Sequence, residues 1–209
     1  MIFVTDLEGV LIPEIWVEIA EKTGIRELRQ TTHDVADFEA LMAIRIQALT
    51  RNHLRLSDIV RIAENVMPFP GSIEYLSWLR KRGPILILSD TFTELADDIV
   101  TRLGGYPLFS NRFKVNSRGH IVGYQLRIRG RKDAIVTALR DIGYTLVAVG
   151  DGFNDLSMLH TSHYPILFNP ARGLVRHLKG HQPPIVRNFV QLKSEMERII
   201  ETVQEPGLD

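Results

Sequence analysis

The 209-residue sequence contains no cysteine and no apolar run long enough to cross a bilayer. A disulfide, a thiolate nucleophile and a cysteine-ligated metal are therefore excluded. An excess of charge of either sign is also missing, because 25 basic residues balance 25 acidic ones. We therefore expect neither a nucleic-acid nor a membrane partner. The start of the chain lacks the basic-then-apolar pattern of a signal peptide, which together with the missing cysteine favours a cytoplasmic protein.

The composition, 44% apolar and 24% charged, is that of a globular chain with a full core. Four short runs are almost continuously apolar, a pattern typical of parallel strands covered on both faces. They are IFVT (2–5), ILIL (85–88), LVAV (146–149) and YPILF (164–168). Helical patterns that end next to a glycine separate them, at 73–82, 94–103 and 132–142. This order predicts an α/β fold with a doubly wound parallel sheet.

Three segments do not fit this alternation. The stretch from Pro13 to Met67 has helical patterns and no strand candidate, and PFPG (68–71) closes it. We therefore expect a helical cap, residues 13–70, inserted into a core domain of residues 1–12 and 71–209. Two alternating runs in FKVNSRGHIVGYQL (113–126) flank a turn and predict a β-hairpin at one edge. The acidic end ETVQEPGLD (201–209) is expected to be frayed.

Polar residues gather where the predicted strands end, which is where open α/β sheets bind their ligands. They are Asp6 and Glu8 after the first strand, Ser89 and Asp90 after the second, Asp151, Asn154 and Asp155 after the third, and Lys132 at the start of the preceding helix. Asp6, Asp151 and Asp155 would repel one another unless a cation lay among them, and their oxygens are ligands that magnesium prefers. Asp6 could also attack phosphorus and form an aspartyl phosphate.

The remaining residues suit the charges that such a transfer creates. Ser89, Lys132, backbone N–H groups and the metal would neutralise the transferred phosphoryl group. Glu8 is placed to protonate the leaving oxygen and later to deprotonate the attacking water. Taken singly, Ser89 would suit a helix N-cap and Lys132 a solvated surface. Their joint placement at strand ends and helix starts favours one active site.

The motifs DLEGV, LSDT, Lys132 and GDGFND resemble the four motifs of the haloacid dehalogenase superfamily of phosphatases, over nearly the whole chain. The resemblance implies a Rossmann-like core, Mg²⁺ and a two-step reaction through an aspartyl phosphate. It makes Asp6 the nucleophile and Glu8 the acid/base. It also implies phosphate or substrate binding by Ser89, Asp90, Lys132 and Asn154, metal binding by Asp6, Glu8 and Asp151, and a supporting role for Asp155.

Glu8 departs from the superfamily pattern, which has aspartate at both positions of the first motif. Glutamate keeps the acid/base chemistry but adds a methylene, so its carboxyl has to be held differently. Together with PEIW, LMAIRIQAL, LILSDTF, VGYQLR and ILFNP, it resembles the ThrH-type phosphoserine phosphatases. That resemblance implies a small phosphorylated amino acid as substrate, with homoserine as a phosphoryl acceptor beside water.

One residue of the expected cap supports an amino-acid substrate independently. Arg45 lies at the centre of an apolar helical stripe formed by Phe38, Leu41, Met42 and Leu49. An inward arginine needs an anion, and the planar guanidinium suits a carboxylate. In phosphoserine phosphatases the matching arginine holds the substrate carboxylate, and Glu14 matches the acid that receives the ammonium group. Two alternatives stay open: Arg45 pairs with a structural acid or reaches outward, and Glu14 merely favours a helix N-terminus.

Two other functions also stay open. One is a phosphatase for another small phosphorylated metabolite, and the other is a binding or regulatory protein that keeps the fold and hydrolyses poorly. The intact Asp6, Lys132 and Asp151 argue against the second. Trp16 and Trp78 lie on apolar helix faces and are expected in the core. The sequence does not indicate the oligomeric state.

Overall fold

The computed structural model describes residues 1–31, 34–35, 37–127, 131–170, 173–177 and 182–204. Its centre is a seven-stranded sheet with the order β4-β3-β2-β1-β5-β6-β7. The strands are β1 (Ile2–Thr5), β2 (Ile85–Phe92), β3 (Leu108–Val115), β4 (Ile121–Gln125), β5 (Leu146–Gly150), β6 (Tyr164–Phe168) and β7 (Ile185–Val186). Neighbouring strands are parallel except for β3 and β4. The predicted α/β fold with a parallel sheet is therefore confirmed.

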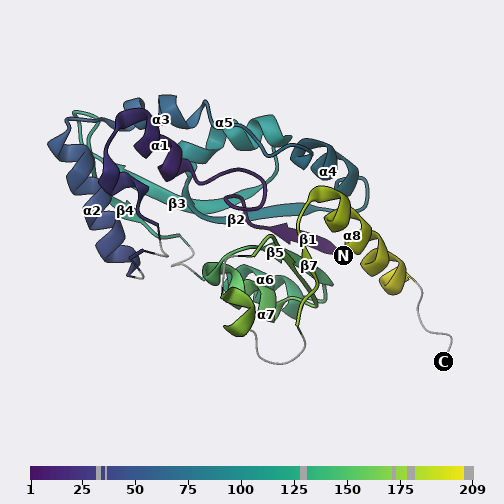
Figure 1. Ribbon diagram of the computed structural model, residues 1–209. Coiled ribbons are helices and arrows are strands. Elements are labelled where there is room, and N and C mark those ends of the chain that lie inside the picture. The colour runs from purple at the N-terminus through teal and green to yellow at the C-terminus, as the bar shows by residue number, and fades with distance from the viewer. Residues whose placement is uncertain (32–33, 36, 128–130, 171–172, 178–181, 205–209) are drawn as a thin grey trace.

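Helices cover both faces of this sheet, with α1, α3, α4 and α5 on one side and α6 and α7 on the other (Figure 1). None of the helices in the described part of the chain is long and apolar enough to span a membrane. The helices are α1 (Ile15–Thr23), α2 (Phe38–Arg51), α3 (Leu56–Ala63), α4 (Ser72–Leu79), α5 (Thr93–Leu103), α6 (Lys132–Asp141), α7 (Leu156–Thr161) and α8 (Phe189–Gln204), with short 3₁₀ turns at Arg26–Arg29, Phe153–Asp155 and Leu174–His177.

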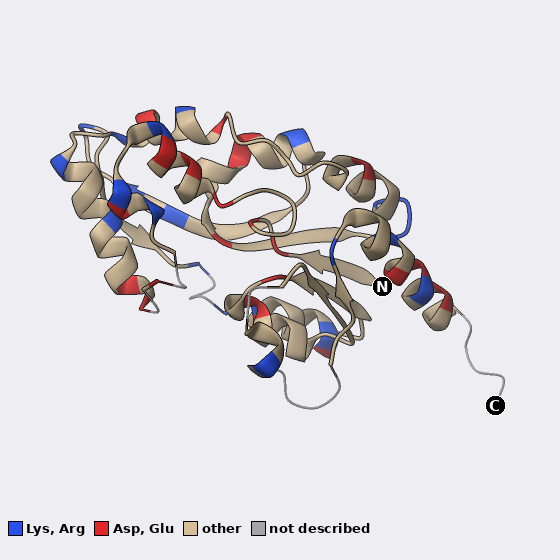
Figure 2. Ribbon diagram, viewed as in Figure 1, with Lys and Arg blue, Asp and Glu red and all other residues tan. Residues whose placement is uncertain are grey.

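The apolar strands arise from this double cover. Successive side chains of a strand point to opposite faces of the sheet. In β1, Phe3 packs in the core that α1, α3, α4, α5 and α8 complete, whereas Ile2 and Val4 pack with α6 and α7. Both faces of β1 are thus buried, and no polar residue alternates with the apolar ones. Charged residues of both signs are interspersed over the helices instead (Figure 2).

Most predicted strands are confirmed, with one difference of consequence. β1 and β6 coincide with the runs 2–5 and 164–168, and β3 and β4 form the expected hairpin at the sheet edge. β2 continues beyond Leu88 to Phe92, so the polar segment Ser89–Thr91 belongs to the strand itself. β3, the first strand of the hairpin, pairs with β2 in parallel and contacts the end of this extension, where Phe92 is opposite Asn111.

The C-terminal part of the fold was not predicted. β7 has two residues, too few for a period, and α8 buries Leu192, Met196 and Ile199 at helical spacing. The expectation of a frayed end is wrong for residues 201–204, which extend α8. Residues 205–209 lie outside the described residues. α8 packs beside α4 and closes one face of the core.

The segment between β1 and α4 contains α1, the turn Arg26–Arg29, α2 and α3, and no strand among its described residues. Its helical character agrees with the sequence. Ile15, Trp16 and Ile19 of α1 and Ile59 of α3 join the core cluster that includes strand residues of the sheet. A separate cap domain with the bounds 13–70 stays a prediction.

We expect Met196→Ala to destabilise the protein, because Met196 is fully buried at the centre of α8. The loss of a buried side chain of this size costs about 2–5 kcal/mol of the free energy of unfolding. Urea denaturation measures this loss. Val190→Ala on the same helix is the control, because Val190 is 76% exposed and its truncation should change the free energy little. Equal effects of the two changes would contradict the placement of α8.

Candidate active site

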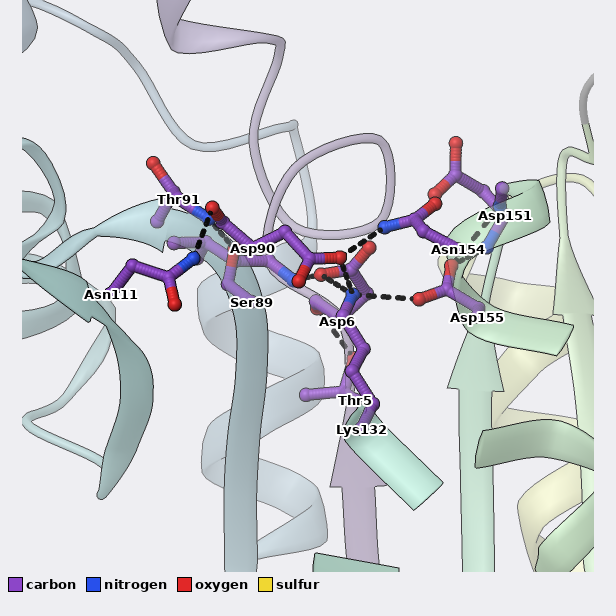
Figure 3. A network of polar contacts seen from close by, with 12 residues as sticks. Thr5, Asp6, Ser89, Asp90, Thr91, Asn111, Lys132, Asp151, Asn154 and Asp155 are labelled. Carbon is purple, nitrogen blue, oxygen red and sulfur yellow. Dashed lines mark hydrogen bonds and ion pairs between the residues drawn. The ribbon is translucent and has the colours of Figure 1, made fainter. Parts of the chain in front are cut away.

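The predicted motif residues meet at the carboxyl ends of three adjacent strands, β2, β1 and β5 (Figure 3). Asp6 directly follows β1, Ser89 and Asp90 lie in the second half of β2, and Asp151 directly follows β5. Lys132, the first residue of α6, reaches into the same place. Residues that lie far apart in the sequence therefore form one polar network.

Lys132 is completely buried, and its ammonium group lies near carboxylates from the ends of three strands. Its Nζ lies 2.7 Å from Asp155 Oδ1, 2.9 Å from Asp6 Oδ1 and 3.9 Å from Asp90 Oδ2. Burial on its own would lower the pKa of Lys132, but the negative charges, Asp155 first, raise it well above its usual range. Lys132 is thus a fixed cation of the site and not a solvated lysine.

Asp6 is buried. Its Oδ1 accepts a hydrogen bond from the backbone N–H of Leu7 at 2.7 Å and also forms the ion pair with Lys132. Burial raises the pKa of Asp6 well above its usual range, the charge of Asp155 adds to this, and Lys132 opposes it. A divalent cation nearby would reverse the shift and keep Asp6 ionised, as a nucleophile has to be.

The carboxylates fit such a cation. Asp6, Asp151 and Asp155 each place an oxygen within 4.8 Å of the others. Asp155 is already engaged, because Oδ1 contacts Lys132 and Oδ2 accepts the N–H groups of Asp151 and Gly152 at 2.9 and 3.0 Å. Burial first, and then the charge of Asp155, raises the pKa of Asp151 to about 7. Carboxylate oxygens that lie close together in a buried cluster and repel one another are typical of a divalent metal site.

Glycine is required where the loop after β1 approaches this cluster. Gly9 has a φ of +78°, a backbone conformation that favours glycine. A Cβ atom at Gly9 would also overlap the carboxylate of Asp151. The glycine of DLEGV therefore lets the first motif and the last one come into contact.

The same loop shows how the longer side chain of Glu8 is held. Its Oε1 accepts the backbone N–H of Ile15, the first residue of α1, at 2.8 Å. Burial first, and then the charge of Glu14, raises the pKa of Glu8 to about 8. A carboxyl with this pKa carries a proton at neutral pH and can donate it. The acidic cluster found in the described residues forms without Glu8, so metal binding by Glu8 stays a prediction.

Ser89 and Asp90 lie between the paired residues Leu88 and Phe92 of β2, where the register with β3 shifts. Ser89 is buried inside β2, and its Oγ accepts the N–H of Thr91 at 3.3 Å; the helix N-cap alternative is wrong, because α5 starts after Phe92. Asp90 Oδ2 accepts from Asn154 Nδ2 at 3.0 Å, which links the second motif to the last one. Both segments are thereby held in one arrangement around Asp6.

A cavity of about 620 Å³ opens above these residues and includes Asp6, Glu8, Asp151 and Arg45 in its lining. Arg45 is only 5% exposed, so the outward alternative is wrong. Its Nη2 donates to the carbonyl oxygen of Gln30 at 2.7 Å, and no salt bridge to it is found within the described ranges. Burial lowers the pKa of Arg45 to about 10, although the negative charges of Glu8 and Glu14 raise it in part.

Glu14 is exposed, directly precedes α1, and also lines the cavity. Several other lining residues were not assigned to a site from the sequence; they include Trp16, Phe38, Thr91, Leu126 and Phe153. Most of these are apolar or aromatic, and their sequence pattern is the same as that of core residues. Trp16 is in fact both, because it is buried in the core and lines the cavity.

Comparison with known proteins agrees with this geometry. Residues 1–163 match the family model of the haloacid dehalogenase-like hydrolases. The chain therefore belongs to this family, and the resemblance of its motifs is confirmed.

Two relatives are similar over most of their length. Phosphoserine phosphatase ThrH of Pseudomonas aeruginosa is 39% identical over 190 residues, which cover 91% of this chain and 92% of the relative. A phosphoserine phosphatase of Pseudomonas syringae pv. tomato is 40% identical over 190 residues, or 91% and 79%. A substrate-bound phosphoserine phosphatase structure matches with a TM-score of 0.74 and 20% identity over 94% of this chain and 97% of that one, which supports the fold.

The site predicts a metal affinity that rises with pH. Because the pKa of Asp151 is raised in the fold, its protonated form stabilises the metal-free protein at a pH below the pKa of an ordinary aspartate. This stabilisation is lost as the pH rises through about 7. Bound metal requires the ionised carboxylate. We therefore expect magnesium chloride to raise the Tm more at about pH 8 than at about pH 6 in thermal denaturation.

Asp151→Asn removes the titrating carboxylate that is predicted to bind the metal, and it should abolish most of the magnesium-dependent rise at both pH values. Asp97→Asn, at an exposed position of α5, is the matched control and should respond like the wild type. A rise of equal size at both pH values in the wild type would contradict a site that depends on Asp151.

Proposed function

We propose that this protein is a magnesium-dependent phosphoserine phosphatase that hydrolyses L-phosphoserine to serine and phosphate. The proposal depends on Arg45, a buried cation without a salt bridge in the described residues, which lines the same cavity as Asp6, the ion-pair partner of Lys132. A phosphoryl-transfer centre and an anion-binding side chain in one cavity suit a substrate that carries both a phosphate and a carboxylate. The names of the relatives support the same substrate. A cytoplasmic location is part of the proposal.

In the first step, a carboxylate oxygen of Asp6 attacks phosphorus and the bond to the serine oxygen breaks. Glu8 gives its proton to that oxygen, for which its pKa of about 8 is suitable. Serine leaves, and Asp6 carries an aspartyl phosphate. Lys132 and Ser89 face the phosphoryl oxygens and offset their charge.

In the second step, Glu8 is a carboxylate and takes a proton from a water molecule, whose oxygen attacks phosphorus. The bond to Asp6 breaks, phosphate leaves, and both carboxyl groups return to their first state. Asp6 and Asp151 would hold Mg²⁺, which supplies positive charge for the phosphoryl group when bound. Asn154 and Asp90 support the phosphate-binding segments, and Asp155 keeps Lys132 and the loop of Asp151 in place.

The cap segment 13–70 would recognise the amino-acid part of the substrate. Arg45 binds its carboxylate, and Glu14 receives its ammonium group. The backbone N–H of Ile15 in this segment donates to Glu8, which supports a shared loop for chemistry and recognition.

Homoserine is a second candidate acceptor for the phosphoryl group. The cavity of about 620 Å³ is within the range of sites for larger ligands than a phosphorylated three-carbon amino acid. Such an acceptor would take the place of water in the second step. Formation of phosphohomoserine from phosphoserine and homoserine, measured by mass spectrometry, would support it, and release of phosphate alone would exclude it.

We expect Asp6→Asn to lower kcat by at least roughly 10³-fold, because the amide cannot attack phosphorus. Phosphate release from phosphoserine measures this effect. Asp97→Asn is the control for an ordinary loss of one carboxylate. A folded Asp6→Asn protein with near-normal turnover would exclude the aspartyl-phosphate route.

Arg45→Ala tests the substrate class. A shielded, bidentate pair with a carboxylate contributes on the order of 1.5–3 kcal/mol, so kcat/KM for phosphoserine should fall roughly 10- to 200-fold relative to that for p-nitrophenyl phosphate. Arg45→Lys should recover only part of this loss, because an ammonium lacks the planar fork. Arg51→Ala is the matched control, because Arg51 lies on the same helix and forms an exposed ion pair with Glu27.

The ratio of the two substrates separates recognition from general damage to the fold. If Arg45→Ala lowers both activities equally, Arg45 has a structural role and a phosphate ester without a carboxylate becomes the better candidate substrate.

A further inference from the structure

Trp16 and Arg45 form a stacked pair in the wall of the cavity. The central carbon of the guanidinium lies 4.5 Å from the centre of the Trp16 ring. Trp16 is 3% exposed and Arg45 is 5% exposed, and both line the cavity. A desolvated cation over an indole face is attracted by the negative potential of the ring. The pair joins α1 to α2, two segments that are separated in the sequence.

The stacking leaves the edge of the guanidinium for another partner. The N–H groups of arginine lie in the plane of the group, and a carboxylate binds bidentately in that same plane. An aromatic ring on the face therefore does not compete with a carboxylate at the edge. It restricts rotation of the plane, which decides where the edge points.

The hydrogen bonds of Arg45 do not use all its donors. Nη2 donates to the carbonyl oxygen of Gln30 at 2.7 Å, and Nη1 has a weak contact with the Met42 sulfur at 3.9 Å. Nε is buried and has no hydrogen-bond partner in the described part of the structure. These contacts hold one end of the guanidinium, and the Trp16 ring holds its plane.

Trp16 is linked through two phenylalanine rings to β2, the strand that carries Ser89. Its ring packs edge to face on Phe113 of β3, with centroids 6.3 Å apart and planes at 87°. Phe113 stacks on Phe92, the last residue of β2, at 3.7 Å and 11°. Ser89 precedes Phe92 by three residues in the same strand. A continuous aromatic contact therefore connects Arg45 to the strand of Ser89.

We propose that Trp16 is a positioning residue that orients Arg45 for a substrate carboxylate and thereby selects amino-acid phosphate esters. The proposal rests on the phosphoserine phosphatase function above. Trp16 fixes the plane of Arg45, and its contact with Phe113 fixes the offset between the carboxylate site and the phosphoryl site. The selected substrates are those in which carboxylate and phosphate are separated by this offset.

The experiment compares Trp16→Leu, Trp16→Phe and a matched control, Trp78→Leu. Trp78 also stacks with an arginine, Arg82, at 3.8 Å, but it does not line the cavity. We expect Trp16→Leu to lower the ratio of kcat/KM for phosphoserine to that for p-nitrophenyl phosphate roughly 3- to 30-fold, mainly through KM. Trp16→Phe retains an aromatic face and should recover most of the ratio. Trp78→Leu should keep the wild-type ratio.

A double-mutant cycle with Arg45→Ala identifies the path of the effect. If Trp16 acts through Arg45, Trp16→Leu lowers the ratio in the wild type but not in the Arg45→Ala background. An equal loss in both backgrounds, or no recovery by Trp16→Phe, would overturn the proposal while Arg45 keeps its role. If Trp16→Leu is poorly folded, Trp16→Met, which also lacks an aromatic face, replaces it in the same cycle. A wild type that does not hydrolyse phosphoserine would overturn the proposed function and this inference together.

Discussion

The ammonium group of Lys132 is the contact on which the site depends. It contacts Asp6 and Asp155, two carboxylates that follow different strands, at 2.9 and 2.7 Å and without solvent. Removal of one partner of a buried ion pair leaves an uncompensated charge, which costs roughly 3–5 kcal/mol. Asp155 in turn accepts two backbone N–H groups of the loop that carries Asp151. The positions of Asp6, of the last motif and of the acidic cluster therefore depend on one buried cation.

The site separates two tasks between two parts of the chain. In the proposed function, the strand ends of β1, β2 and β5 supply the groups that act on phosphorus, and α1 and α2 supply those suited to the rest of the substrate. Glu8 joins the two parts, because it follows β1 and accepts a hydrogen bond from the first residue of α1. An aspartate at this position is one methylene shorter. Glu8, the proposed acid/base, is thus linked directly to the segment that holds Trp16 and Arg45.

The sequence alone was sufficient for the parts of the fold where a strong pattern coincides with burial. β1 and β6 were predicted to the residue because both faces of each are covered and no polar residue interrupts the run. The candidate site was predicted from the joint placement of acids, a serine and a lysine at strand ends and at a helix start, since each of these residues alone has an ordinary structural use. β7 has only two residues, too few to show the alternation of a strand. α8 was missed because charged residues on its exposed face separate its buried apolar residues. Trp16 could not be assigned to the site from the sequence. A buried aromatic residue on an apolar helix face has the same sequence pattern whether it packs in the core or against an arginine.

The proposed mechanism requires that the phosphoryl group is transferred to Asp6, and trapping the phosphorylated protein tests this directly. Glu8→Gln cannot activate water, so an aryl phosphate with a good leaving group should phosphorylate this variant faster than water releases the phosphate. The variant is mixed with p-nitrophenyl phosphate and magnesium, quenched in acid, digested and measured by mass spectrometry. We predict one added phosphoryl group on the N-terminal peptide, localised to Asp6 and labile to hydroxylamine. Release of p-nitrophenol without a phosphorylated peptide, or phosphorylation at Ser89 instead, would contradict the account.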